Sequence, residues 1–326
     1  MGRDFRFFGL LLISGFLLFV TGCDSFIFSD PDRQKRPLQI ATNVWPGYEP
    51  LYLARALGKL DPKKVRLVEM TSSSQVIRNL RNGLVQGGCL TMDEQLTLME
   101  YGMNVDTILI MDVSHGADVI IAQKGIANIQ KLKGKRVGLE DSALGAYVLA
   151  RALEINDLQA DELKLVSLNI SEHLTAFRQD QVDAVVTFEP IRSILLREGG
   201  KQIFDSSQMP GEIVDVLLVT KEAQQTHGEE VKHLIDAWFF ALEFIKTNPQ
   251  KAYELMAPRL QLKPTEVPAV FEGLKLPTRQ ENLDMMEGER PPLLLTRQML
   301  LQTMQEKGLV KKGLELPNGF HSEFLK

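Results

Sequence analysis

The chain has 326 residues, a formal net charge of −5, 44% hydrophobic residues and 24% charged residues. This length allows two domains or one large one, and the composition is that of a globular protein. The negative charge argues against a nucleic acid as partner, because nucleic-acid binding usually needs a basic face.

The first 22 residues have the features of an export signal. A positive start leads into an uncharged run from Phe7 to Val20, which is shorter than the about 20 residues of a membrane span. The run ends in VTGC at 20–23, which resembles a bacterial lipobox. This resemblance implies that Cys23 is acylated, with palmitate for example, and anchors the exported protein to the periplasmic face of a membrane. Asp24 favours the inner membrane, and the alternative is an ordinary signal peptide or short anchor with a coincidental cysteine.

Residues 23–37 predict a tether, because they mix Ser, Asp, Pro and charged residues without a period. Strand and helix patterns then alternate, which predicts an α/β fold with mostly parallel sheets covered on both faces. From Glu222 onward the pattern is mostly helical and predicts a cover for the first part of the chain. The expected strands are 38–43, 65–70, 84–90, 105–113, 117–124, 135–140, 163–169, 182–189, 201–207 and 214–220.

Three stretches resemble a known family. They are WPGYEPLYLARALGKL, then SSSQVIRNLRNGLVQGG, and then the run from LKGKRVGLEDSALGAYVLARALEIN through VSLNISEHLTAFRQDQVDAVVTFEP. Their order and spacing resemble periplasmic substrate-binding proteins of ABC importers, in the group that binds nitrate, sulfonates, taurine or thiamine precursors. The resemblance implies a type II periplasmic-binding-protein fold, with a ligand in a cleft between two α/β lobes joined by two crossing strands near 112–116 and 211–216. Lobe one would be 38–112 plus 217–326, and lobe two would be 113–214.

In parallel sheets, ligands bind beyond the carboxyl ends of the strands. The expected ends carry short polar or aromatic turns, and several are helix starts whose free N–H groups can hold polar atoms. As a structural alternative, the aromatic rings could pack over the sheet edge, and the hydroxyls and acids could cap helices. We expect ligand contacts from Trp45, Tyr48, Ser72, Ser73, Thr91, Asp93, Ser142, Phe188 and Glu189.

The charge of these turns indicates the class of ligand. Binders of sulfonate or nitrate usually have a positive site, whereas these turns contain no Lys or Arg. An acidic, aromatic-walled cleft favours an amine or a heteroaromatic ring, such as a pyrimidine precursor, over a sulfonate. The alternative is that the acids only serve helix N-termini. The acids are Asp93, Glu94, Asp112, Glu140, Asp141 and Glu189.

Two rival functions stay open. An enzyme is disfavoured, because Cys89 belongs to no catalytic motif and only His115 falls near a crossing. We therefore expect no catalytic residue, no metal and no cofactor, and a monomer that partners an ABC permease and the membrane. The other rival is a lipoprotein that presents its bound solute to a membrane sensor, which uses the same ligand-bound state.

Overall fold

The computed structural model describes residues 36–140, 142–314, 316 and 319–326. The expectations for the signal at 1–22, for Cys23 and for nearly all of the tether lie outside the described residues, as does Asp141. Residues Arg36–Lys326 form one compact unit. None of the helices in this described part is long and apolar enough to cross a lipid bilayer.

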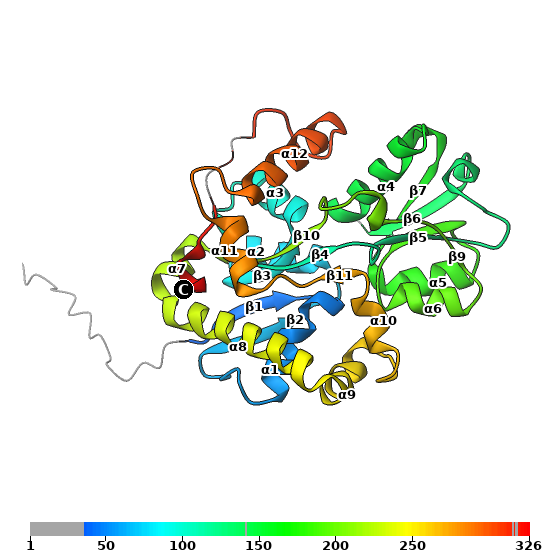
Figure 1. Cartoon of the computed structure of the whole chain (residues 1–326). Helices are drawn as coiled ribbons and strands as arrows, with labels where there is room; N and C mark the ends of the chain where they lie inside the picture. The colour runs from blue at the N-terminus through cyan, green and yellow to red at the C-terminus, as the bar shows by residue number, and fades with distance from the viewer. Residues whose placement is uncertain (1–35, 141, 315, 317–318) are drawn as a thin grey trace, which may run out of the picture. The chain divides into compact units, whose positions relative to one another are not determined.

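Lobe one is built on a six-stranded sheet with the order β11-β4-β10-β3-β1-β2. In Figure 1 its first strands are blue and cyan, and its C-terminal helices are yellow to red. We use "lobe one" for this sheet with its helices. Its strands are β1 (Leu38–Thr42), β2 (Val65–Glu69), β3 (Gly87–Thr91), β4 (Val105–Ser114), β10 (Val214–Thr220) and β11 (Leu274–Lys275).

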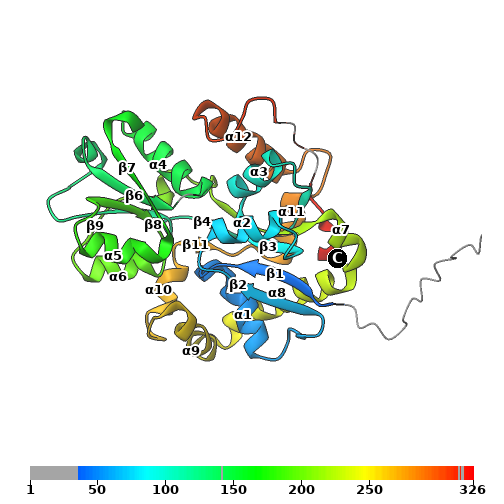
Figure 2. The same cartoon turned by 180° about the vertical axis from the view of Figure 1, so that it is seen from behind.

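Lobe two is built on a five-stranded sheet with the order β7-β6-β8-β5-β9, shown in green in Figure 1. Figures 1 and 2 show α4 on one face of this sheet and α5 and α6 on the other. The predicted two-lobed α/β architecture is confirmed, while the exact residue limits of the lobes stay a prediction. The strands are β5 (Val119–Ala122), β6 (Arg136–Glu140), β7 (Lys164–Leu168), β8 (Ala184–Thr187) and β9 (Lys201–Asp205).

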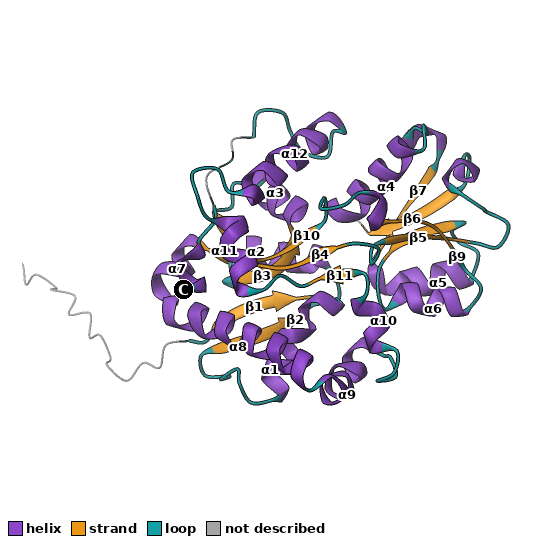
Figure 3. Ribbon diagram, viewed as in Figure 1, coloured by secondary structure: helices purple, strands orange, loops and turns teal. Residues whose placement is uncertain are grey.

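The prediction of mostly parallel sheets is wrong, because both sheets are mixed (Figure 3). β1 pairs in parallel with β2 and β3, and β6 pairs in parallel with β7 and β8. β10 is antiparallel to β3 and β4, and β5 is antiparallel to β8 and β9. The chain leaves lobe one after β4 and returns along β10, so these two strands run in opposite directions. The alternation of strands and helices does not reveal this reversal.

Some helices begin at a side-chain cap that the sequence provides. Ser72 precedes α2, and its Oγ accepts a hydrogen bond from the Gln75 N–H at 3.2 Å. The long helix α8 buries Trp238 completely and packs against α1 and α9. The α-helices are α1 (Glu49–Ala56), α2 (Ser73–Arg81), α3 (Met92–Glu100), α4 (Ala143–Ile155), α5 (His173–Arg178), α6 (Ile191–Arg197), α7 (Lys221–Thr226), α8 (Gly228–Thr247), α9 (Pro249–Leu260), α10 (Val267–Phe271), α11 (Arg279–Met286) and α12 (Pro292–Glu306).

Candidate functional site

Two adjoining cavities, which we call the cleft, are lined by residues of both lobes. Each leaves about 10 Å³ for the centre of a water-sized molecule, so each holds about one water and the cleft is nearly closed in this structure. The first is lined by Asn43, Trp45, Tyr48, Ser73, Thr91, Glu94, Asp118, Leu144, Phe188 and Asp215. The second shares Asp118, Leu144 and Phe188 and adds Glu140, Ser142, Gly145, Val148, His173, Val186 and Thr187.

The turn between β1 and α1 anchors two aromatic rings to the crossing strands. Trp45 Nε1 donates a hydrogen bond to Asp112 Oδ2 at 3.0 Å, and the Tyr48 hydroxyl donates one to Asp215 Oδ1. Asp112 on β4 stands opposite Asp215 on β10 in the antiparallel register. Gly47 is required between the rings, because a Cβ there would lie 1.8 Å from Asp112 Oδ2.

The two aspartates form a buried carboxyl pair. Neither side chain is more than 3% exposed. Burial raises the pKa of Asp112 to about 8, although the hydrogen bond from Trp45 opposes this rise. Burial and the charge of Asp112 raise the pKa of Asp215 well above its usual value. The pair therefore retains a proton near neutral pH.

Two further carboxyls face the same cavity. The Thr91 N–H donates to Glu94 Oε2 at 3.1 Å, and the other oxygen, Oε1, is buried without a partner. Burial, together with the charges of Asp93 and Glu140, raises the pKa of Glu94 well above its usual value. Burial raises the pKa of Asp118 to about 7, and its Oδ2 also lacks a partner. Among the described residues that line the cleft there is no lysine or arginine to offset these acids.

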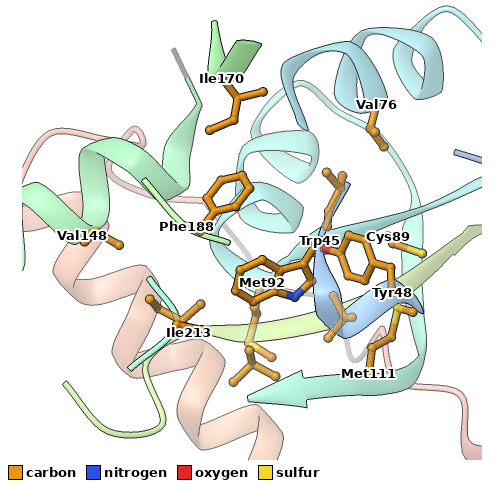
Figure 4. Packing of buried hydrophobic residues seen from close by; sticks show 14 of the residues in the cluster. Trp45, Tyr48, Val76, Cys89, Met92, Met111, Val148, Ile170, Phe188 and Ile213 are labelled. Carbon is orange, nitrogen blue, oxygen red and sulfur yellow. The ribbon is translucent and has the colours of Figure 1, made fainter. Parts of the chain in front are cut away.

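The lobes touch at several places, and two of these contacts, one ring pair and one polar contact, border the cleft. The Trp45 and Phe188 rings lie edge to face, with centroids 5.4 Å apart (Figure 4). The Ser74 N–H and Oγ donate to Glu140 Oε1 at 3.3 and 3.2 Å. Ser74 lies on α2 and Glu140 at the end of β6, so this contact joins the two sheets' carboxyl edges.

Six of the predicted ligand residues lie in the cleft. They come from five segments of the chain that are far apart in the sequence, which the α/β fold brings to one place. Their contact with a ligand stays a prediction. Trp45, Tyr48, Ser73, Thr91 and Phe188 line the first cavity, and Ser142 lines the second.

Three predicted residues do not line it. Ser72 is the N-cap of α2. Asp93 is 1% exposed and lies behind the wall, where burial raises its pKa to about 6. Glu189 accepts hydrogen bonds from Arg192 Nη1 at 2.9 Å and from the Ser193 N–H at 3.1 Å. Ser72 and Glu189 therefore lie at helix starts, which is the structural alternative to ligand contact.

Three residues that line the first cavity, Asn43, Asp118 and Asp215, were not predicted from the sequence. The prediction that His115 is the histidine near the cleft is wrong, because His115 is exposed and outside the cleft whereas His173 is buried in it. Burial lowers the pKa of His173 to about 4, so its ring is neutral. Its Nδ1 lies 3.2 Å from Thr187 Oγ1.

Nothing in the described part of the chain groups three or more histidine, cysteine or acidic side chains so that they could hold a metal ion. Cys89 is completely buried in β3, and burial raises the pKa of its thiol well above the usual value. It is therefore a structural side chain, as the sequence indicated. The side chains that line the cleft offer mainly hydrogen-bond acceptors and aromatic rings.

The family model described as NMT1/THI5 like matches residues 45–252. A Brucella abortus protein, named as a binding protein without a stated ligand, is 22% identical over 173 residues, which are 51% of this chain and 53% of that protein. The chain thus spans about half the length of this curated relative. An Escherichia coli protein named for binding aliphatic sulfonates is 20% identical over 217 residues, 66% of this chain and 68% of that protein.

Solved structures show the same fold. The alkanesulfonate-binding protein SsuA of Xanthomonas axonopodis pv. citri, bound to MOPS, superimposes with a TM-score of 0.75 at 17% identity, covering 89% of this chain and 99% of that one. The desulfurization enzyme DSZB gives a TM-score of 0.65 at 16% identity, covering 89% and 98%. These matches confirm the predicted family resemblance and the bilobal periplasmic-binding-protein fold. They also show that this fold serves an enzyme as well as binding proteins.

Proposed function

The chain belongs to the NMT1/THI5-like family, and we propose that it is an extracytoplasmic solute-binding protein that delivers a small molecule to an ABC importer. The observation that carries this proposal is the cleft, whose lining residues come from both sheets. A solute held there contacts both lobes at once, so its binding favours the closed arrangement over the open one.

The ligand that we propose is an amine or a polar heteroaromatic ring. Glu94, Asp118 and Asp215 line the first cavity, while a basic side chain is absent from its described lining. Trp45 and Phe188 add aromatic surface next to these acids. A sulfonate would have no basic partner in this lining, and its negative charge would repel each carboxyl that is ionised. The sulfonate-binding relatives share the fold, and in this chain the acids argue for a different specificity.

We also propose that the protein is a monomer held at the inner membrane by lipid on Cys23, with Asp24 favouring that membrane. The VTGC sequence at 20–23 supports the lipid anchor. The ABC permease would be the membrane partner. No catalytic step is part of the proposal, because Cys89 lies outside the cavities and His173 is held against Thr187.

The experiment that tests the solute-binding function uses residues 24–326, purified without exposure to denaturant. The protein is then denatured, the released small molecules are identified by mass spectrometry, and the dimensions of the protein with and without solute are compared by small-angle X-ray scattering. We expect a released solute and a smaller radius of gyration when it is added back. The proposed function is refuted if the protein releases no small molecule and its radius of gyration does not change when a metabolite extract of the cells is added.

A further inference from the structure

The cavity wall presents hydrogen-bond acceptors that the protein itself leaves unused. Asn43 Oδ1, Glu94 Oε1 and Asp118 Oδ2 are buried, and none of them has a hydrogen-bond partner in the described structure. The three residues line the same cavity, and each is at least nine-tenths buried. Leaving such a buried group unsatisfied is unfavourable, so three together call for a partner that donates hydrogen bonds.

These acceptors stand on opposite sides of the cleft. Asn43 follows β1, and Glu94 lies in the first turn of α3, so both belong to lobe one. Asp118 precedes β5 and belongs to lobe two. The Asn43 Nδ2 group is 3.5 Å from Ser73 Oγ, which leaves the amide oxygen directed away from that serine. A donor placed among them would bond to both lobes at the same time.

The charge of the wall sets a second requirement. Glu94, Asp118 and Asp215 line one small volume, and a fourth carboxyl, Asp112, accepts the hydrogen bond of Trp45 next to it. Carboxyls this close repel each other when ionised, and the repulsion raises the free energy of the empty closed cleft. A positive charge between them reverses this effect. The Trp45 and Phe188 rings add a face on which a cation or a flat conjugated group can rest.

We propose that the ligand carries a cationic group with at least two N–H donors, a primary ammonium or an amidinium, that bridges Glu94 of lobe one and Asp118 of lobe two. The inference rests on the proposed solute-binding function and specifies its ligand. The donors distinguish this ligand from a quaternary ammonium ion, which has the charge without the N–H groups. The positive charge distinguishes the proposed ligand from a neutral ring, which has N–H donors but no charge. The cavity is nearly closed around its lining residues, which limits the ligand to a small molecule.

Matched probes separate shape, charge and donors. Benzamidine, benzamide and benzenesulfonate have nearly the same outline and are cationic, neutral and anionic. Ethylammonium and tetramethylammonium are both cations, but only the first donates hydrogen bonds. Each probe is titrated into residues 24–326, and binding is followed by thermal shift and by isothermal calorimetry. We expect benzamidine to bind about 10- to 150-fold more tightly than benzamide, because a charge-assisted hydrogen bond contributes about 1.5–3 kcal/mol.

Two variants test the bridge itself. Glu94→Gln and Asp118→Asn keep the side-chain outline and remove one charge each, and each should weaken benzamidine binding by at least about 10-fold. The exposed residue Asp161 provides the control, because Asp161→Asn removes the same charge far from the cleft and should leave affinity unchanged. Circular dichroism and the melting temperature establish that every variant is folded.

The results distinguish this inference from the proposed function. Equal binding of benzamidine and benzamide, binding of benzenesulfonate alone, or no response to either N–H cation would overturn the cation bridge. In each of these cases a solute released from the purified protein would still uphold the solute-binding function. Tetramethylammonium binding as tightly as ethylammonium would overturn the need for donors, and with it the bridge between Glu94 and Asp118.

Discussion

The variant Asp118→Asn should make the ligand-free protein more stable above neutral pH. Asp118 is 3% exposed, its Oδ2 has no partner, and burial raises its pKa from 3.8 to about 7. Asp93 adds repulsion, while a hydrogen bond from Ser114 partly opposes the rise. The folded state therefore keeps a proton that the unfolded state has released. The stabilising contribution of Asp118 is complete below its unfolded pKa and is lost as the pH rises through its folded pKa.

The size of the effect follows from the two pKa values. Each pH unit between them costs about 1.4 kcal/mol, so the interval from 3.8 to about 7 gives a penalty of up to about 4 kcal/mol. Asparagine cannot ionise and avoids this penalty at every pH. For a folded unit of residues 36–326 the unfolding entropy is about 0.6 kcal/mol per kelvin. A gain of about 2–4 kcal/mol therefore raises the melting temperature by about 3–6 °C.

The assay is thermal unfolding of Asp118→Asn, of the natural chain and of Asp161→Asn in buffers from pH 4.5 to 8.5. We expect a stabilisation that is small at pH 4.5, grows between pH 5 and 7, and is constant above pH 7.5. Asp161 is exposed, so its variant should follow the natural chain throughout. A gain that is equal at every pH would refute the role of ionisation, and a loss of stability at pH 8 would refute the reasoning about burial.

Three further predictions concern buried contacts. Trp45→Phe keeps a ring but removes the donor to Asp112, and should lower the free energy of unfolding by about 1–3 kcal/mol in urea titrations; an unchanged midpoint would contradict it. Arg259→Met leaves the buried Glu49 carboxylate without its ion pair, and the same titration should show a free energy of unfolding that is lower by about 3–5 kcal/mol. An unchanged midpoint would show that the ion pair is dispensable. Cys89 should react with a thiol reagent only after unfolding, and rapid labelling of the native protein would show that β3 opens.

Much of the fold could be predicted from the sequence, because the signals are local. Apolar runs such as 105–113 and 214–220 are buried strands, and turns with hydroxyls or acids mark the starts of helices α2 and α3. The directions of the strands could not be predicted in this way. Whether a strand is parallel to its neighbour depends on where the chain goes between them, and β4 and β10 carry it out to lobe two and back.

The same limit explains which site residues were found. A search at the carboxyl ends of strands finds Thr91 at the end of β3, but not Asp215 at the start of β10. β10 is antiparallel to β3, so its beginning lies at the edge where β3 ends, and Asp215 stands opposite Thr91 in the register. Asp118 likewise precedes β5, which is antiparallel to β8. In a mixed sheet, site residues have to be sought at both ends of each predicted strand.

The choice of acids on the crossing strands argues for a positively charged ligand. Trp45 and Tyr48 need only an acceptor each, and asparagine at 112 or 215 would supply one without charge. The chain instead buries two carboxyls side by side, next to Glu94 and Asp118. Such an arrangement is costly for stability, since each carboxyl must either keep a proton near neutral pH or bury a charge without a counterion. A cation in the cleft would offset that cost, and this is the physical reason for proposing a positively charged ligand.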